Sequence, residues 1–274
     1  MRAAQWRRRR VDEGPGLVKT AIVAAFGMAM VLALFLTPLV RAVARSRGLV
    51  AKPSGDRWHK QPTALLGGAA IAASFLVPAV LFLPPASPRW GIVFGALAMA
   101  VVGLVDDLRG MPPLVKLGGQ AVAAGIAVAF GIRLGVIPIP WIAIPLTIFW
   151  ILLIVNAVNL LDNMDGLAAG ITGIASVSLL VFSFAAGDLA VGVVSACCLG
   201  ATLGFLRYNF HPATIFMGDS GSLFLGFILA SSSIVGTWQT PANYVFALVV
   251  PVLILAVPLF DTTFVTFGRT LTGR

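Results

Sequence analysis

Charged residues are scarce in this chain of 274 residues, in which Asp, Glu, Lys and Arg together make up 11%. An ordinary soluble domain carries about 25%. Because 59% of the residues are hydrophobic and the mean hydropathy is +0.98, the composition excludes a water-soluble globular protein. Apolar runs near the roughly 20 residues that a helix needs to cross the hydrocarbon core recur along the chain. We therefore predict an all-α, polytopic membrane protein.

Cysteine and histidine are also rare, with two residues of each. Cys197 and Cys198 are adjacent within an apolar run, and this placement favours small packing residues over a disulfide or a metal site. His59 and His211 lack a metal-ligand spacing, so we expect each to form hydrogen bonds instead. The net charge of +9 does not indicate nucleic-acid binding, because Lys and Arg in membrane proteins lie mostly in short loops and set the orientation.

Nine apolar windows are predicted to cross the membrane. A basic tail, residues 1–16, precedes a single transmembrane domain, residues 17–274. The predicted spans cover residues 17–40, 64–83, 89–105, 114–132, 141–159, 166–186, 189–206, 220–237 and 242–260.

Basic residues predict the orientation, because successive loops must alternate across the bilayer. The loops that follow odd-numbered spans carry 11 of the 19 Lys and Arg residues, whereas the other face, without the tail, carries Arg89 and Arg133. The positive-inside rule makes the first face cytoplasmic and the N-terminus external. The arginines of the tail favour the opposite placement of the N-terminus, and the sum over several loops outweighs them.

Acidic residues gather on the same face. A carboxylate at the end of a span is costly unless it is paired or hydrated, so this clustering favours a shared polar site at the membrane surface over charges that merely populate loops. Seven of the ten acids belong to this group: Asp56, Asp106, Asp107, Asp162, Asp165, Asp219 and Asp261.

The first acidic motif is the pair Asp106 and Asp107 at the end of the third predicted span. Adjacent carboxylates repel each other, so such a pair needs strong solvation or a cation. Mg²⁺ takes oxygen ligands and commonly connects carboxylates to substrate phosphates. A helix-end cap paired with Arg109 explains the pair equally well.

The second motif runs from residue 156 to residue 170. Asn156, Asn159, Asp162 and Asp165 recur at intervals of three, which places neighbours on one helix face. These groups are costly to bury without partners, and they suit a ribose, a uracil edge or a metal shell. A polar network between helices is the alternative.

The third motif leads into the eighth predicted span. Gly218 and Gly221 permit close approach of the backbone to a ligand, and free N–H groups at a helix start favour phosphate. Asp219 is therefore a candidate metal or phosphate residue, with a helix N-cap as the alternative. His59 and Lys60, in the first cytoplasmic loop, suit a phosphorylated substrate, although the basic charge there also fits an orientation signal.

These segments resemble the polyprenyl-phosphate N-acetylhexosamine-1-phosphate transferases, a family that includes phospho-N-acetylmuramoyl-pentapeptide transferase and the UDP-GlcNAc:undecaprenyl-phosphate transferases. The resemblance covers residues 52–261 approximately, and four motifs follow the family's order. Asn-Phe-His-Pro-Ala at 209–213 and Phe-Met-Gly-Asp at 216–219 are more similar to the UDP-GlcNAc branch. Residues 162–166 read Asp-Asn-Met-Asp-Gly where the family usually has Asp-Gly-Leu-Asp-Gly. The family usually continues into a His-containing cytoplasmic loop and further spans, so we expect this chain to be either a fragment that lacks a C-terminal portion or a family member without that loop.

The resemblance implies that a polyprenyl phosphate attacks the β-phosphorus of a UDP-sugar, releasing UMP and starting a lipid-linked glycan for cell-envelope polysaccharide. It implies a bacterial cytoplasmic membrane, a site on the cytoplasmic face, Mg²⁺ as cofactor with Mn²⁺ as substitute, and no nucleic-acid partner; a homodimer is compatible with it. The alternatives are the pentapeptide transferase, an inactive scaffold, and a transporter or flippase, which would place ionisable groups near the bilayer midplane.

The expected site residues divide into three roles. Catalytic residues are Asp106, Asp107 and Asp165; metal ligands are Asp219 and Asp107; substrate-binding residues are His59, Lys60, Asn156, Asn159, Asp162, Asn209 and His211.

Overall fold

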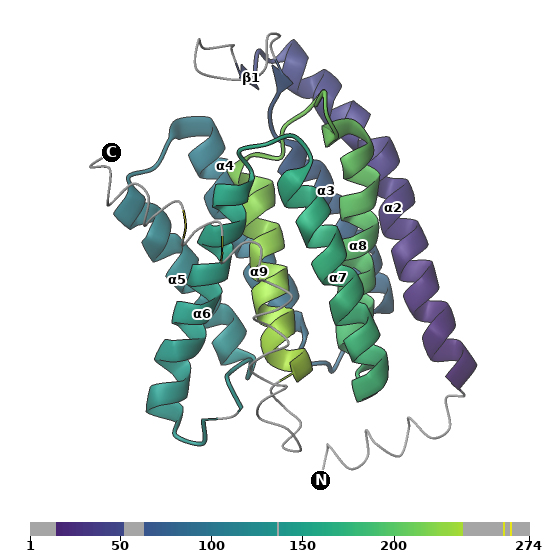
Figure 1. Cartoon of the computed structure of the whole chain (residues 1–274), viewed down its shortest axis with the longest axis vertical. Helices are drawn as coiled ribbons and strands as arrows, with labels where there is room; N and C mark the ends of the chain where they lie inside the picture. The colour runs from purple at the N-terminus through teal and green to yellow at the C-terminus, as the bar shows by residue number, and fades with distance from the viewer. Residues whose placement is uncertain (1–14, 52–62, 136, 238–259, 261–263, 265–274) are drawn as a thin grey trace.

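The computed structural model describes residues 15–51, 63–135, 137–237, 260 and 264, and within them the chain is a bundle of eight helices (Figure 1). The helices are α2 (Pro15–Ser46), α3 (Gly67–Phe82), α4 (Trp90–Arg109), α5 (Pro113–Ala129), α6 (Pro140–Leu161), α7 (Leu167–Ala186), α8 (Leu189–Asn209) and α9 (Gly218–Thr237). A two-stranded antiparallel sheet joins β1 (Val50–Ala51) to β2 (Thr63–Ala64).

The helices match the first eight predicted spans in order, and the prediction of an all-α polytopic membrane protein is confirmed. Six of the described helices are long and apolar enough to cross a membrane. The other two, α3 with 16 residues and α5 with 17, are about 24 to 26 Å long at 1.5 Å per residue, less than the roughly 30 Å of the hydrocarbon core. Residues 242–259 of the ninth predicted span lie outside the described residues, so nine spans are not confirmed.

Local sequence explains where the helices start and stop. Pro113 and Pro140 open α5 and α6, where the missing N–H of proline costs no helical hydrogen bond. Gly110 and Gly187 follow α4 and α7 with φ of 66° and 65°, a backbone conformation that glycine adopts without steric cost. These stops place the polar motifs in short connections at the helix ends.

Close glycine contacts show that α2 and α8 run parallel. A Cβ at Gly200 would lie 2.9 Å from the Cβ of Ala29, and one at Gly204 would lie 2.6 Å from the Cβ of Ala33. Residue numbers thus rise together along both helices, and only glycine permits this approach. The first and seventh predicted spans therefore point the same way, as alternation of loops requires.

Helix α9 lies at the centre of the bundle, packed against α3, α4, α6 and α7 (Figure 1). Its apolar side chains are almost entirely buried, and Phe224 meets Phe75 edge to face with ring centroids 5.3 Å apart. The free thiols of Cys197 and Cys198 are also fully buried, which confirms their expected packing role. The surroundings of α9 therefore hold its first turn, which carries Asp219, in place.

At the end of the bundle where α7 stops, Asp188 joins two loops. Its carboxylate accepts hydrogen bonds from the backbone N–H groups of Ala190 and Val191 at 3.1 and 3.2 Å, and it pairs with Arg89 at 2.7 Å. The aspartate thus caps α8 and connects it to the segment that precedes α4.

We expect Asp188→Ala to lower the free energy of unfolding by about 2 to 4 kcal/mol, because it removes a cap and leaves the largely buried Arg89 without this partner. Thermal melting of purified protein measures the change. Asp188→Asn keeps one capping oxygen and should lose less; equal stability of the alanine variant and the wild type would contradict the assignment.

Candidate active site

The polar motifs meet at one end of the bundle, where α4, α6 and α8 end and α5, α7 and α9 begin (Figure 1). Contacts within the described residues join α4, α5, α6 and α9 in one cluster and the loops beside α7 and α8 in a second. The prediction that distant carboxylates share one region is thus confirmed for these residues. Asp56 and Asp261 lie outside the described residues, as do His59 and Lys60.

Asp107 binds the first turn of α9. Its two oxygens accept hydrogen bonds from the backbone N–H groups of Asp219, at 2.8 Å, and Ser220, at 3.0 Å. The start of a helix carries unpaired N–H groups and a partial positive charge, so a carboxylate from another helix stabilises it. Gly218 has φ of +71°, and a Cβ there would lie 2.8 Å from either oxygen of Asp107. Asp107 therefore fixes the backbone that carries Asp219.

Asp106 points to a different set of partners. Its Oδ1 accepts a hydrogen bond from the backbone N–H of Met111 at 2.6 Å, which closes the end of α4. Its Oδ2 lies 2.9 Å from the Nζ of Lys116, in the first turn of α5, and the same ammonium contacts Oδ2 of Asp219. Lys116 thus bridges α4 and α9. From the sequence, Lys116 is one of the 11 basic residues that predict the orientation, and its position just after the loop that follows Asp106 and Asp107 is the feature that points to a role in the site.

Asn159 completes the surroundings of Asp219. Its side-chain amide donates to Oδ1 of Asp219 at 2.8 Å and to the hydroxyl of Ser222 at 2.9 Å. The Ser222 hydroxyl in turn donates to the carbonyl of Gly218 at 3.1 Å. The carboxylate of Asp219 is thus directed at Asn159 and Lys116, while the carboxylate that caps α9 belongs to Asp107.

Asn156 lies one turn before Asn159 and is engaged with α5. Its amide nitrogen donates to Gln120 at 2.7 Å and to the carbonyl of Leu152 at 2.7 Å, and its oxygen accepts from Gln120 at 3.3 Å. Gln120 is buried. This pair is a polar network between helices, the alternative that sequence left open for the second motif. Contact of Asn156 with substrate stays a prediction.

The second cluster ties residues 165–166 to residues 209–215. Oδ2 of Asp165 accepts from the backbone N–H of Ala213 at 3.0 Å and lies 2.9 Å from Nδ1 of His211. Asn209 accepts from the N–H of Gly166 at 3.1 Å and donates to the carbonyl of Ile215 at 3.0 Å. Asn209 is buried, whereas the side chain of His211 is 79% exposed. Asp165 and Asn209 thus hold the loop, and His211 presents its ring to the surface.

Asp162 lies between the two clusters, directly after the last residue of α6. Burial raises its pKa well above the usual range of an aspartate, and the neighbouring carboxylates of Asp219 and Asp107 raise the pKa further. Both effects disfavour the charged form, and a hydrogen bond with the backbone of Gly218 lowers the pKa and opposes them in part.

The segment before Gly218 is anchored to the residues that connect β2 to the start of α3. Ala64 accepts a hydrogen bond from the N–H of Phe216 at 2.8 Å, and the carbonyls of Phe216 and Met217 accept from Gly67 and Gly68 at 2.9 and 2.8 Å. These bonds place that connection beside the start of α9.

The first cluster suits a hard divalent cation by its donor chemistry. Asp106 and Asp219 are close enough to hold one cation between them, since both carboxylates contact Lys116. Mg²⁺ prefers such oxygen ligands. Across the ranges that the structure describes, no three His, Cys, Asp or Glu side chains form a group ready to hold a metal. A bound cation would therefore complete its shell with water or substrate oxygens.

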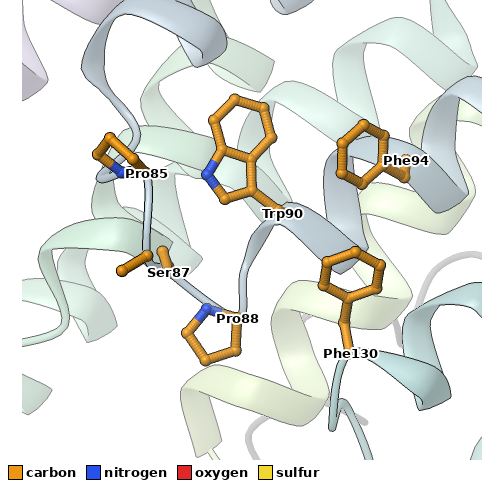
Figure 2. A pocket seen from close by; sticks show the side chains of 7 residues that line it. Pro85, Ser87, Pro88, Trp90, Phe94 and Phe130 are labelled. Atoms are coloured by element: carbon orange, nitrogen blue, oxygen red, sulfur yellow. The ribbon is translucent and has the colours of Figure 1, made fainter. Parts of the chain in front are cut away.

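An apolar groove of about 530 Å³ lies at the other end of α4 (Figure 2). Its wall includes the rings of Trp90, Phe94 and Phe130, with no titratable side chain among the lining residues. Trp90 precedes Asp106 by 16 residues, which is about 24 Å along a helix. The groove is therefore separate from the acidic clusters, and its lining offers no group for phosphoryl chemistry.

The relatives found by comparison with known proteins are all named as transferases. The probable undecaprenyl-phosphate N-acetylglucosaminyl 1-phosphate transferase of Bacillus subtilis (strain 168) is 37% identical over 261 residues, covering 91% of this chain and 72% of that protein. The decaprenyl-phosphate N-acetylglucosaminephosphotransferase of Mycolicibacterium smegmatis is 34% identical, covering 96% and 74%. The phospho-N-acetylmuramoyl-pentapeptide-transferase of Staphylococcus aureus (strain JH9) is 32% identical, covering 76% and 74%.

The match to a family model spans residues 89–237, which run from the start of α4 to the end of α9 and contain both clusters. With this match and these relatives, the chain belongs to glycosyl transferase family 4.

Proposed function

We propose that this protein transfers N-acetylglucosamine 1-phosphate from UDP-N-acetylglucosamine to a polyprenyl phosphate, with release of UMP. One observation carries the proposal: a continuous set of side-chain contacts at one end of an apolar bundle, which runs through Asp106, Lys116, Asp219 and Asn159. The relatives at 34 to 37% identity are named N-acetylglucosamine phosphate transferases, which favours this reaction over that of the pentapeptide transferase at 32% and over a transporter or scaffold.

The chemistry needs little covalent help from the protein. A phosphate monoester has a second pKa near 6, so the lipid nucleophile is already mostly dianionic at neutral pH. Catalysis then depends on neutralising the negative charge of the pyrophosphate and on aligning the attacking and leaving oxygens. A cation site at the membrane surface meets the first need, because the lipid phosphate and the soluble UDP-sugar both reach that depth.

Each residue of the first cluster receives a distinct role. Asp219 and Asp106 would hold Mg²⁺, with Mn²⁺ as substitute, and the metal would supply positive charge to the phosphoryl oxygens. Asn159 orients the carboxylate of Asp219 through its hydrogen bond to Oδ1. Asp107 positions Asp219 through the backbone of α9 instead of binding the metal directly. Lys116 adds a second positive charge.

The second cluster is assigned to the substrate. The exposed ring of His211 is directed by Asp165 and is available to a phosphate or sugar hydroxyl. Asp162 lies between the clusters and would contact the nucleotide or the metal shell. His59 and Lys60 remain proposed phosphate contacts. The whole site is assigned to the cytoplasmic leaflet of the bacterial inner membrane, following the distribution of basic residues.

The proposal is tested with purified protein, undecaprenyl phosphate and one UDP-sugar at a time, measuring UMP release and the lipid product by mass spectrometry. UDP-N-acetylglucosamine should yield both products, and omission of the lipid should abolish UMP release. Product from UDP-N-acetylmuramoyl-pentapeptide alone would establish the rival reaction, and product from neither donor would contradict the proposal.

Chelation by EDTA should abolish UMP release in this assay, because no described cation of the cluster other than Lys116 can neutralise the pyrophosphate. Excess Mg²⁺ should restore the rate, and Mn²⁺ should substitute for it. Turnover that survives EDTA would remove the metal from the mechanism while leaving the transfer reaction in place.

A further inference from the structure

Lys116 lies between Asp106 and Asp219, the two carboxylates that would hold the metal. The ammonium lies 2.9 Å from Oδ2 of Asp106 and contacts Oδ2 of Asp219. The three side chains are 17%, 16% and 27% exposed respectively, so water screens their charges only in part.

The hydrogen-bond partners of the carboxylate oxygens show which contact a bound metal would displace. Asp106 Oδ1, both oxygens of Asp107 and Asp219 Oδ1 accept from neutral N–H groups of the backbone or of Asn159. A carbonyl or carboxylate oxygen has two lone pairs and can bind a cation while keeping a neutral donor. The two remaining oxygens contact a cation, and two cations between the same carboxylates repel each other.

We propose that Lys116 is a resident counter-ion that competes with the divalent metal for Asp106 and Asp219 until the nucleotide sugar binds. The inference rests on the proposed function, because the pyrophosphate of the donor provides the second place for the ammonium. Lysine suits this exchange, since its compact charge sits on a flexible four-carbon stem. Without metal the ammonium offsets the repulsion between the two aspartates; with metal and donor it moves to a phosphoryl oxygen.

The exchange couples the two binding events. When the metal binds to the protein alone, it displaces the ammonium, which then has no anionic partner. When the donor is also bound, the displaced ammonium pairs with a phosphoryl oxygen instead. The donor therefore tightens metal binding, and by linkage the metal tightens donor binding by the same factor. Removal of the positive charge at position 116 should abolish most of this coupling.

The test measures binding of Mn²⁺ by electron paramagnetic resonance, with purified protein that has no polyprenyl phosphate, so that no turnover occurs. For wild type, UDP-N-acetylglucosamine should tighten Mn²⁺ binding by about tenfold after correction for metal held by free nucleotide. Lys116→Met and Lys116→Gln should bind Mn²⁺ about tenfold more tightly than wild type without nucleotide, and the donor should add little. Lys116→Arg keeps the charge and should retain weak binding without nucleotide.

Lys19→Met is the matched control, because Lys19 lies near the start of α2, at the far end of the bundle, and is exposed (Figure 1). This variant should bind Mn²⁺ as wild type does. Metal affinity that is unchanged or weaker in both Lys116→Met and Lys116→Gln overturns the inference. Failure of the proposed transferase reaction would be detected by a different measurement, the UMP-release assay on the wild-type protein, which does not depend on these variants.

Discussion

Replacement of Asp219 by Asn is expected to lower the rate of UMP release by about 100-fold or more, the usual loss when one electrostatic stabiliser of a transition state is removed. The Asp219 carboxylate contacts both Lys116 and Asn159, so it is the point at which α4, α5, α6 and α9 meet. An amide is neutral and offers one oxygen, and it therefore neither holds a divalent cation firmly nor attracts the ammonium. Steady-state UMP release in saturating Mg²⁺ measures the loss.

Asp188→Asn is the matched control for this change. It makes the same substitution at an aspartate that also pairs with a basic residue, but at the opposite end of the bundle. The control should lose stability and keep the rate per folded molecule. A rate for Asp219→Asn within about threefold of wild type, far less than such a stabiliser contributes, would show that the metal assignment is wrong.

Much of the architecture could be predicted from the sequence, because apolar length and polar interruptions are properties of the chain itself. Eight of the predicted spans correspond to α2 through α9, and the acidic motifs lie at the helix ends where the breaks in hydropathy placed them. Alternation of loops then brings the ends of α4, α6 and α8 to one face without any knowledge of packing.

The partner of each side chain could not be predicted in the same way. Successive residues of a helix point about 100° apart, so the adjacent carboxylates Asp106 and Asp107 face different neighbours. Which one meets Lys116 and which one meets α9 depends on the rotation of α4 within the bundle. The close approach expected at Gly218 is present, but within the described residues its partner is the carboxylate of Asp107.

The amide pair of Gln120 and Asn156 illustrates the same limit. A polar residue within an apolar span signals that a partner exists, and its spacing does not tell whether that partner is a substrate or another helix. Gln120 carries no motif in the sequence, and only the contact between α5 and α6 reveals its role.

Substitution of Gly218 by Ala is expected to reduce the rate by about 30- to 100-fold, because loss of alignment at a reacting centre commonly costs that much. The new Cβ would lie 2.8 Å from both oxygens of Asp107, and an L side chain is strained at φ of +71°. The carboxylate must then leave the N–H groups of Asp219 and Ser220, and the first turn of α9 shifts. UMP release, with the melting temperature measured alongside, detects the effect.

Gly187→Ala separates strain from contact, because Gly187 has φ of +65° and a Cβ there would meet nothing within 4 Å. Gly187→Ala should lose a similar amount of stability and keep its rate of UMP release.

Asp107→Asn then distinguishes the two roles open to Asp107. As a positioning residue it retains one accepting oxygen, so the variant should be more active than Asp107→Ala and should bind Mn²⁺ with nearly wild-type affinity. A loss of Mn²⁺ affinity by about tenfold in Asp107→Asn, together with an active Gly218→Ala, would instead make Asp107 a direct metal ligand, since an amide replaces a charged ligand poorly.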